Sequence, residues 1–335
     1  YISGIIFILL LSFFVYCKDS KNAKSKNPYA ELISTHPAKD KNLYSIDNSW
    51  NERVQNIDET HKDYVKKLNE IDDFKEIPKP TDKIDLMKQR IKEISDNEPE
   101  ILKKIKNKYI YGIYFCEEMG GTGITGIVYE NNKPIAGYII LDAGVLSRKA
   151  NEWISYKENS AFENGSFQLQ IKIEEDENDT ETNAMEYIIL HELGHIVSFV
   201  EGEVPDPRLE DRDFENYKFT KYDWVGEFET NKDNLFPERK DIHFYSDKKT
   251  PIASAPGIYK NLKKTPFPTL YSALNANDHF AESFVSYIHL YIYNKPWELT
   301  ITKENKNIFN MKNGLEEERC KKEKKEIGEI VNNFK

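Results

Sequence analysis

Two histidines and a glutamate lie close together in the segment His191-Glu192-Leu193-Gly194-His195. If the segment is helical, residues four apart project from nearly the same face, one turn above each other. Both imidazoles can then reach a single metal ion, at about 2.0–2.1 Å for a Zn–N bond. Glu192 lies beside the first histidine and can reach a water on that ion without binding the ion itself. This spacing therefore favours hydrolysis assisted by a metal.

The residues around this segment predict a buried helix. Asn183 followed by Glu186 is typical of a helix start. Apolar side chains then cover almost every face, namely Tyr187, Ile188, Leu190, Ile196, Val197, Phe199 and Val200. Because unpaired polar groups are costly inside a protein, two histidines and a glutamate on such a helix indicate a metal site more than a plain packed helix.

The segment resembles the HExxH motif of zinc metallopeptidases. A catalytic zinc usually takes three protein ligands, and the downstream stretch Asp278-His279-Phe280-Ala281-Glu282-Ser283-Phe284 offers two carboxylates. HExxH with a glutamate on a later helix resembles the gluzincin branch of the zincin metallopeptidases, and Phe280-Ala281-Glu282 resembles the third-ligand segment of lethal-factor-type catalytic domains. This resemblance covers about 109–294. It implies Zn²⁺ bound by His191, His195 and Glu282, with Glu192 as the general base.

The residues themselves leave the third ligand open. Glu282 is expected, but Asp278, four residues earlier, is the alternative, or it could support a ligand without binding the metal. Glu201 lies six residues after His195, where metzincins carry a third histidine. The glycine that metzincins need between these two positions is replaced by Ser198.

The resemblance also implies a mechanism in which Glu192 accepts a proton from water and returns it to the leaving amine of a peptide. The developing oxyanion needs a further hydrogen-bond donor. In gluzincins a tyrosine or histidine from the downstream region often serves, and Tyr271 is the candidate here, ahead of His279 and His243. A packed aromatic ring is the alternative reading of Tyr271.

Composition and charge are those of a soluble globular protein. The chain has 335 residues, of which 39% are hydrophobic and 31% are charged. The net charge of −10 argues against nucleic acid as a partner, because no excess of basic residues is present to neutralise phosphates. We expect a protein or peptide substrate.

The N-terminus has a composition of its own. Residues 4–16 form an uncharged apolar run that ends at Cys17 and is shorter than the roughly 20 residues of a membrane-spanning helix. The run resembles a bacterial lipoprotein signal, which implies export to the cell envelope or surface and membrane attachment only through a lipid on Cys17. A plain signal, an uncleaved anchor and a buried helix are the alternatives. Cys116 and Cys320 could pair in an exported protein, or Cys116 could be a buried free thiol.

Hydrophobic periodicity predicts an α+β, zincin-like fold with N-terminal helices, a small mixed sheet, an active-site helix and a mainly helical C-terminal part. An edge strand from 124–141 or 167–173 is expected to pair with an extended substrate. The expected organisation is a signal at 1–17, a flexible tether at 18–42, a helical region at 43–108, an upper zincin subdomain at 109–201, a lower subdomain at 202–294 and a charged helical tail at 295–335.

Two other functions remain open from the sequence. The first is a surface-anchored binding lipoprotein whose zinc site is structural or vestigial, although a structural site more often has four protein ligands, commonly cysteines. The second is a hydrolase that cleaves a non-protein amide or a sugar-linked bond by the same chemistry.

Overall fold

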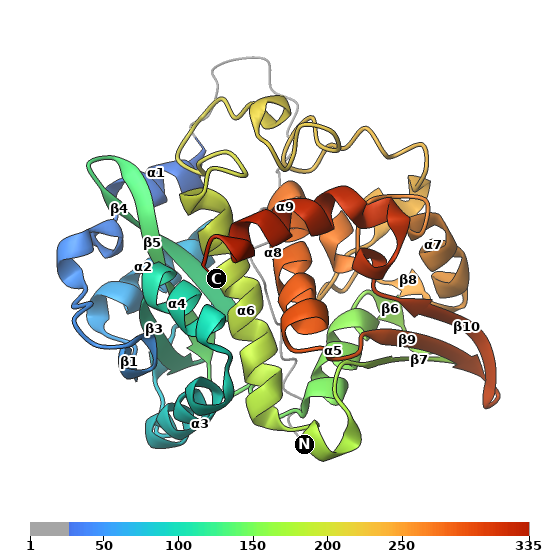
Figure 1. The fold of residues 1–335 in the computed structure, drawn as a ribbon, viewed down its shortest axis with the longest axis horizontal. Helices are drawn as coiled ribbons and strands as arrows, with labels where there is room; N and C mark the ends of the chain where they lie inside the picture. Colours follow the sequence, from blue (N-terminus) through green and yellow to red (C-terminus); the bar gives the residue numbers. More distant parts are fainter. Residues whose placement is uncertain (1–26, 335) are drawn as a thin grey trace.

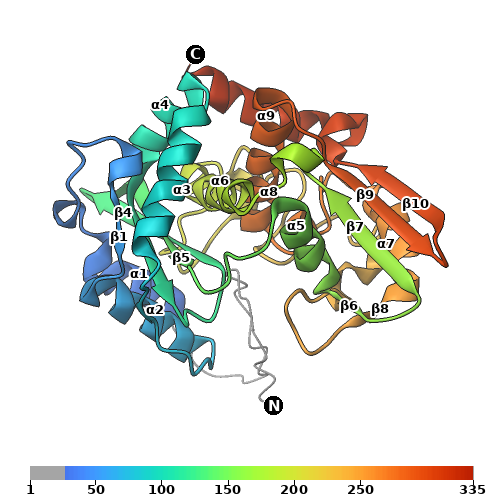
Figure 2. The same ribbon diagram turned by 90° about the horizontal axis from the view of Figure 1, so that it is seen from below.

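The computed structural model describes residues 27–334, and its architecture is α+β, with 47% of residues in helices and 19% in strands. The central element is the long helix α6 (Glu181–Val200), which carries the HELGH segment. Figures 1 and 2 show α6 between a sheet with its covering helices on one side and a second group of helices and strands on the other. The candidate site residues on α6 therefore lie near the middle of the molecule.

The larger sheet has the strand order β1-β3-β5-β4, with β2 paired to β3. Its strands are β1 (Val54–Asn56), β2 (Lys79–Pro80), β3 (Ile110–Glu117), β4 (Gly123–Glu130) and β5 (Lys133–Asp142). Strands β4 and β5 form an antiparallel hairpin whose turn residues Asn131 and Asn132 both have positive φ. That geometry is typical of a tight turn in which asparagine is favoured. The hairpin places β4 at an edge of the sheet, next to α6.

Helices cover both faces of this sheet. Alternate residues of a strand point to opposite faces, so Ile113 and Phe115 pack with α3 (Ile84–Asn97), α4 (Glu100–Tyr109) and α6, while Tyr114 packs with α2 (Glu59–Ile71). These helices confirm the prediction of helical structure before residue 109.

The described part of the segment expected to be a flexible tether, from residue 27 on, is folded. Residues 28–43 form α1 (Pro28–Thr35) and two short 3₁₀ turns, and Tyr29 and Leu32 are buried. Asp40 also forms a bridge with Tyr129 of β4. The Lys-, Asn- and Ser-rich composition did not predict this packing. Two apolar side chains three residues apart, here Tyr29 and Leu32, are enough to hold one helical turn against a neighbouring surface.

The second half of the molecule contains a separate sheet of β7 (Phe167–Lys172), β9 (Glu298–Lys303) and β10 (Lys306–Lys312). The structure differs here from the expected organisation in two respects. The half-buried strand at 167–173 does not join the main sheet, and 295–335 is more than a helical tail. Pairing between β7 and β9 joins residues about 130 positions apart, and local periodicity carries no information about such a partner.

Four helices complete this half. They are α5 (Ala150–Asn159), α7 (Ala255–Leu262), α8 (Ala276–Tyr287) and α9 (Lys321–Asn332), and the two-residue strands β6 (Phe162–Glu163) and β8 (Thr250–Pro251) pair beside them. The apolar spacing of the sequence predicts a helix over 278–293, and α8 begins two residues earlier, at Ala276, and continues as a π-helical turn over Ile288–Ile292. The irregular region 202–277 holds α7 and several 3₁₀ turns, which the sequence did not reveal.

Helix α9 differs from the solvated helix expected there, because it buries Ile327, Ile330 and Val331. It also buries Glu323, whose two carboxylate oxygens have no hydrogen-bond partner among the described residues. Burial raises the pKa of Glu323 to about 7, opposed by the nearby charge of Lys322. The folded protein therefore holds a proton on Glu323 that the unfolded chain releases at a lower pH.

The sign of the resulting pH dependence follows from this raised pKa. Protonated Glu323 contributes to the stability of the folded protein at low pH, and this contribution is lost as the pH rises through about 7. We expect Glu323→Gln to leave the unfolding free energy nearly unchanged at pH 5 and to raise it by roughly 1–3 kcal/mol at pH 8. Urea unfolding of both proteins at the two pH values measures this. Equal differences at pH 5 and pH 8 would contradict it.

Two further expectations concern the N-terminus and the cysteines. The apolar run and Cys17 lie outside the described residues, so the lipoprotein signal stays a prediction. Within residues 27–334, no helix has the length and apolar character needed to cross a membrane. Cys116 and Cys320 are both free and buried, so they do not pair with each other.

Candidate metal centre

The helix that carries the motif begins at Glu181, and its cap lies three residues before Asn183, the cap that the sequence suggested. Thr180 is the N-cap, and its side-chain oxygen accepts a hydrogen bond from the backbone N–H of Asn183. The helix then continues without interruption to Val200. His191 and His195 therefore lie one helical turn apart on the same face, as expected.

A close approach of α8 brings the downstream segment to this face. A Cβ atom on Gly194 would lie 2.8 Å from the Cα of Ala281, a distance that the two backbones do not tolerate. The glycine within the motif and the alanine of Phe280-Ala281-Glu282 therefore allow α6 and α8 to pack at short range. This packing fixes which side chain of α8 faces the two histidines.

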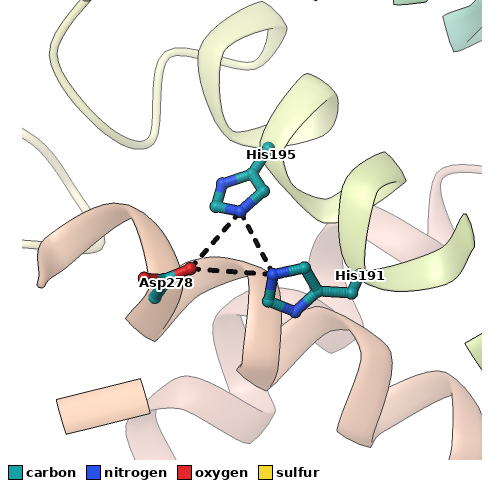
Figure 3. A group of neighbouring side chains, drawn as sticks. All are labelled: His191, His195 and Asp278. Atoms are coloured by element: carbon teal, nitrogen blue, oxygen red, sulfur yellow. Dashed lines mark hydrogen bonds and ion pairs between the residues drawn. The ribbon is translucent and has the colours of Figure 1, made fainter. Parts of the chain in front are cut away.

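Three side chains meet at this contact: His191, His195 and Asp278 (Figure 3). The two Nε2 atoms are 3.2 Å apart, and Oδ1 of Asp278 is 3.6 Å from Nε2 of His191 and 3.5 Å from Nε2 of His195. Two ligands held tetrahedrally at about 2.0–2.1 Å from a zinc ion are themselves about 3.3–3.4 Å apart. The three atoms thus have the spacing of three ligands to one ion.

The cap of α8 orients the aspartate. Asn275 is the N-cap, and its side-chain oxygen accepts from the backbone N–H of Asp278 while its Nδ2 donates to Oδ2 of the same residue at 2.7 Å. Oδ2 is therefore occupied, and Oδ1 faces the histidines. Asp278 is 2% exposed, so its charge has little water around it.

The electrostatics of this group suit a cation. Burial by itself would lower the pKa of His191, but the neighbouring carboxylates of Asp278 and Glu282 raise it to about 9. Burial likewise would raise the pKa of Asp278, yet the two imidazoles hold it below its usual value. A buried site that favours positive charge on its histidines can be satisfied equally by a divalent cation, so the residues fit a zinc ion.

Glu282, expected as the third ligand, lies elsewhere around His191. Its Oε1 is 2.9 Å from Nδ1 of His191, the ring nitrogen that points away from Asp278. The same oxygen accepts a hydrogen bond from Nζ of Lys157 at 2.5 Å, and Oε2 accepts one from Thr269 at 2.7 Å. Glu282 is thus placed to fix the orientation of His191, and both of its oxygens already have protein partners.

One carboxylate oxygen of Glu192 has a hydrogen-bond partner and the other has none among the described residues. Its Oε2 accepts a hydrogen bond from the hydroxyl of Thr125 on β4 at 2.7 Å, whereas Oε1 is buried without a partner. A Cβ atom on Gly123 would lie 2.8 Å from Oε1, so the glycine keeps the space beside this oxygen open. The arrangement leaves Oε1 able to accept a proton from a small molecule such as water.

Tyr271 also lies at the site. Its ring packs edge-on against His191, with centroids 5.9 Å apart, and its buried hydroxyl has no hydrogen-bond partner among the described residues. Burial and the charges of Asp278, Glu282 and Glu192 hold the pKa of Tyr271 well above its usual value, so the hydroxyl keeps its proton. A protonated, unpaired hydroxyl beside the metal ligands is able to donate a hydrogen bond.

The remaining candidates have other partners. His279 bonds to the indole of Trp224 at 3.0 Å, and burial lowers its pKa to about 3, so it is a neutral packing residue. Glu201 pairs with Lys108 and Tyr109 on α4, away from the three ligand atoms. Nε2 of His243 is buried without a partner, but no contact joins this residue to the motif.

Sequence reasoning did not identify Thr125, Lys157 or Thr269. Thr125 lies on β4 and bonds to Glu192, whereas Lys157 on α5 and Thr269 in the loop before α8 both bond to Glu282, so all three reach the site only through the tertiary fold. In the structure Lys157 is 1% exposed, and a lysine this buried requires a partner. Nothing in the local pattern of α5 named that partner.

No protein-family model, no curated protein and no solved structure matches this chain.

Proposed function

We propose that this protein is a zinc-dependent peptidase of the zincin type, with His191, His195 and Asp278 as the metal ligands and Glu192 as the general base. The observation that carries the proposal is the near-equilateral arrangement of two Nε2 atoms and one carboxylate oxygen, 3.2–3.6 Å apart, beside a glutamate with a free oxygen. The arrangement has three protein ligands and an adjacent base, which is the pattern of a catalytic zinc site.

A bound zinc ion would supply a Lewis acid that polarises a peptide carbonyl and makes a neighbouring water more acidic. Glu192 Oε1 takes the proton of the attacking water and later delivers it to the leaving amine. Thr125 holds the other oxygen of Glu192, so that the base keeps one orientation throughout. Oε1 of Glu282 lies against the far nitrogen of His191, and Lys157 in turn holds that carboxylate.

Strand β4 is the proposed partner of an extended substrate. It lies at the edge of the sheet, and among the described residues its outer edge pairs only at Tyr129, with Asp40. Thr125 on the same strand bonds to Glu192, so a peptide added to this edge would pass the base. The sequence left two regions, 124–141 and 167–173, as possible partners of an extended substrate, and this proposal selects the first.

Tyr271 is the proposed oxyanion donor. We expect Tyr271→Phe to lower kcat by about 10- to 100-fold, because one hydrogen bond to the developing negative charge is lost. Zinc content and KM should change little, since the ring remains packed on His191. Steady-state kinetics with zinc-loaded protein measure both parameters. Unchanged kcat would leave Tyr271 as a packing residue only.

The test of the proposal joins metal analysis to digestion of a peptide library. Purified wild-type protein should contain one zinc per chain and cleave library peptides, whereas the Glu192→Gln protein should contain the same zinc and cleave none. One zinc per chain without cleavage would favour a binding protein with a structural metal. Absence of bound zinc after dialysis against micromolar Zn²⁺ would refute the metal centre itself.

A further inference from the structure

The proposed metal centre is almost closed to solvent. His191, Glu192 and Asp278 are each between 1% and 3% exposed, and the side chain of His195 is 12% exposed. The cavity that reaches His195 has a volume of about 50 Å³, which is room for only a few water molecules. A peptide that is hydrolysed at Glu192 needs its backbone beside this group of residues. Part of the chain must therefore move aside before such a substrate binds.

The N-terminal segment 27–43, which we call the strap, lies against the strand proposed to bind the substrate. It consists of Asn27, α1 and the two 3₁₀ turns that follow, and both turns pack against β4. Figure 1 shows α1 beside the hairpin of β4 and β5. Asp40, between the two turns, forms a parallel bridge with Tyr129 of β4. The strap thus takes up part of the outer edge of β4.

The strap also reaches the part of β4 that is nearest the proposed base. Ile33 of α1 lines the small cavity together with Thr125, Ile127 and His195. Thr125 and Ile127 are two residues apart on β4 and so face the same side of the sheet. Because Thr125 bonds to Glu192, Ile33 lies near the place where a peptide would meet the base. The strap therefore follows the edge of β4 from Tyr129 to the level of Thr125.

A bound peptide and the strap need the same space. A strand added to a sheet lies about 4.8 Å from its neighbour in the hydrogen-bonding direction. At Tyr129 the backbone of Asp40 already holds that position. Nearer to Glu192, the side chain of Ile33 forms a wall of the only small cavity described here beside His195. An extended substrate therefore cannot pair along β4 while the strap is in place.

The strap is held mainly by apolar packing and contributes little to the sheet. Tyr29 and Leu32 are buried in one cluster with Tyr64 and Leu68 of α2. The strap adds no full strand, and β4 keeps its long antiparallel pairing with β5 whether or not the strap is attached. The strap can therefore detach without breaking the sheet, at the cost of exposing its apolar side chains to water.

We propose that the strap is an autoinhibitory element: attached, as in this structure, it blocks the edge of β4, and it must detach before a peptide reaches Glu192. The inference rests on the proposed peptidase function and adds its regulation. Only molecules with a detached strap bind substrate, so the apparent affinity for a peptide is reduced by their fraction. A substitution that loosens the strap should therefore activate the protein.

The first test loosens the apolar contact of the strap in the whole chain. Leu32→Ala removes buried atoms that pack on α2 and leaves the proposed metal centre untouched. We expect it to raise kcat/KM of the zinc-loaded protein for library peptides by at least about fivefold. Leu43→Ala is the matched control, because Leu43 also belongs to the strap but is 49% exposed. Its kcat/KM should stay within about twofold of wild type.

The second test uses an ion pair at the surface, where substitutions leave the fold intact. Nζ of Lys41 in the strap lies 2.7 Å from Oε1 of Glu130 at the end of β4, and both side chains are exposed. Lys41→Glu replaces this attraction by repulsion and should raise kcat/KM about two- to fivefold at low salt. The double variant Lys41→Glu/Glu130→Lys restores opposite charges and should return kcat/KM towards the wild-type value. A general loss of stability would not be reversed by the second substitution.

Unchanged kcat/KM in both Leu32→Ala and Lys41→Glu would overturn the inference. A decrease in both would also overturn it, because the strap would then be needed for activity. If the peptidase proposal fails instead, every zinc-loaded variant cleaves nothing. In that case fluorescence anisotropy with the labelled peptide library compares Glu192→Gln with Leu32→Ala/Glu192→Gln. The inference predicts a Kd at least about fivefold lower for the double variant, and equal or unmeasurable binding by both proteins refutes it.

Discussion

Glu192→Gln should reduce peptide hydrolysis by at least about 10³-fold while the protein keeps one zinc per chain. Glu192 directly follows His191 in the chain, one of its carboxylate oxygens has no hydrogen-bond partner among the described residues, and it does not belong to the group of His191, His195 and Asp278. The glutamine keeps its hydrogen bond with Thr125 through one end of the amide but cannot take a proton from water. The Glu192→Gln protein should therefore keep its metal binding and lose the proton transfer that hydrolysis needs.

The measurement is kcat/KM on a cleaved peptide together with zinc analysis of the same preparation. Thr125→Val is a useful companion, because it removes the hydroxyl that orients Glu192 and leaves the base in place. We expect it to lower kcat by a smaller factor, about tenfold. If Glu192→Gln retains activity within threefold of wild type, proton transfer by Glu192 is refuted.

The second large effect concerns the third ligand. Asp278→Asn should weaken zinc affinity at least tenfold more than Glu282→Gln does. Oδ1 of Asp278 faces both Nε2 atoms, whereas Glu282 contacts only the opposite nitrogen of His191. Loss of a partner that merely orients a ligand typically costs about 10- to 100-fold in metal affinity. Loss of the ligand itself should cost more.

Competition with a chelator of known affinity measures both constants. Glu282→Gln also leaves the buried ammonium of Lys157 without its partner, which destabilises the fold independently of zinc. The double variant Lys157→Met/Glu282→Gln controls for this charge, because it removes both members of the pair. If Glu282→Gln or the double variant loses more zinc affinity than Asp278→Asn, Glu282 is the ligand that the motif resemblance implied.

The sequence determined the parts of the site that depend on a single helix. His191, Glu192 and His195 needed only the helical period to be placed on one face, and the apolar residues around them ensured that the helix would be buried. The second helix was also predictable from its own pattern. Gly194 was visible in the motif, but its role was not, since the need for a glycine comes from the backbone of Ala281.

Only the tertiary structure decided which carboxylate faces the histidines. Asp278 and Glu282 lie one turn apart on α8, so both are on the same face, and the helical period cannot choose between them. The choice depends on how far α8 slides along α6, which the Gly194–Ala281 contact fixes. It depends also on Lys157, which approaches from α5 and engages Glu282. A shift of one turn, about 5.4 Å, would exchange the two roles.

The same limit explains the other differences between sequence and structure. The pairing of β7 with β9, the hydrogen bond from Thr125 to Glu192 and the bridge between Asp40 and Tyr129 all join residues distant in the chain. Local patterns of charge and hydrophobicity state what an element needs to bury, but not which distant element buries it. The helix that carries the HELGH segment was therefore readable from the sequence, and the carboxylate that faces its histidines and the residues that support it were set by the fold.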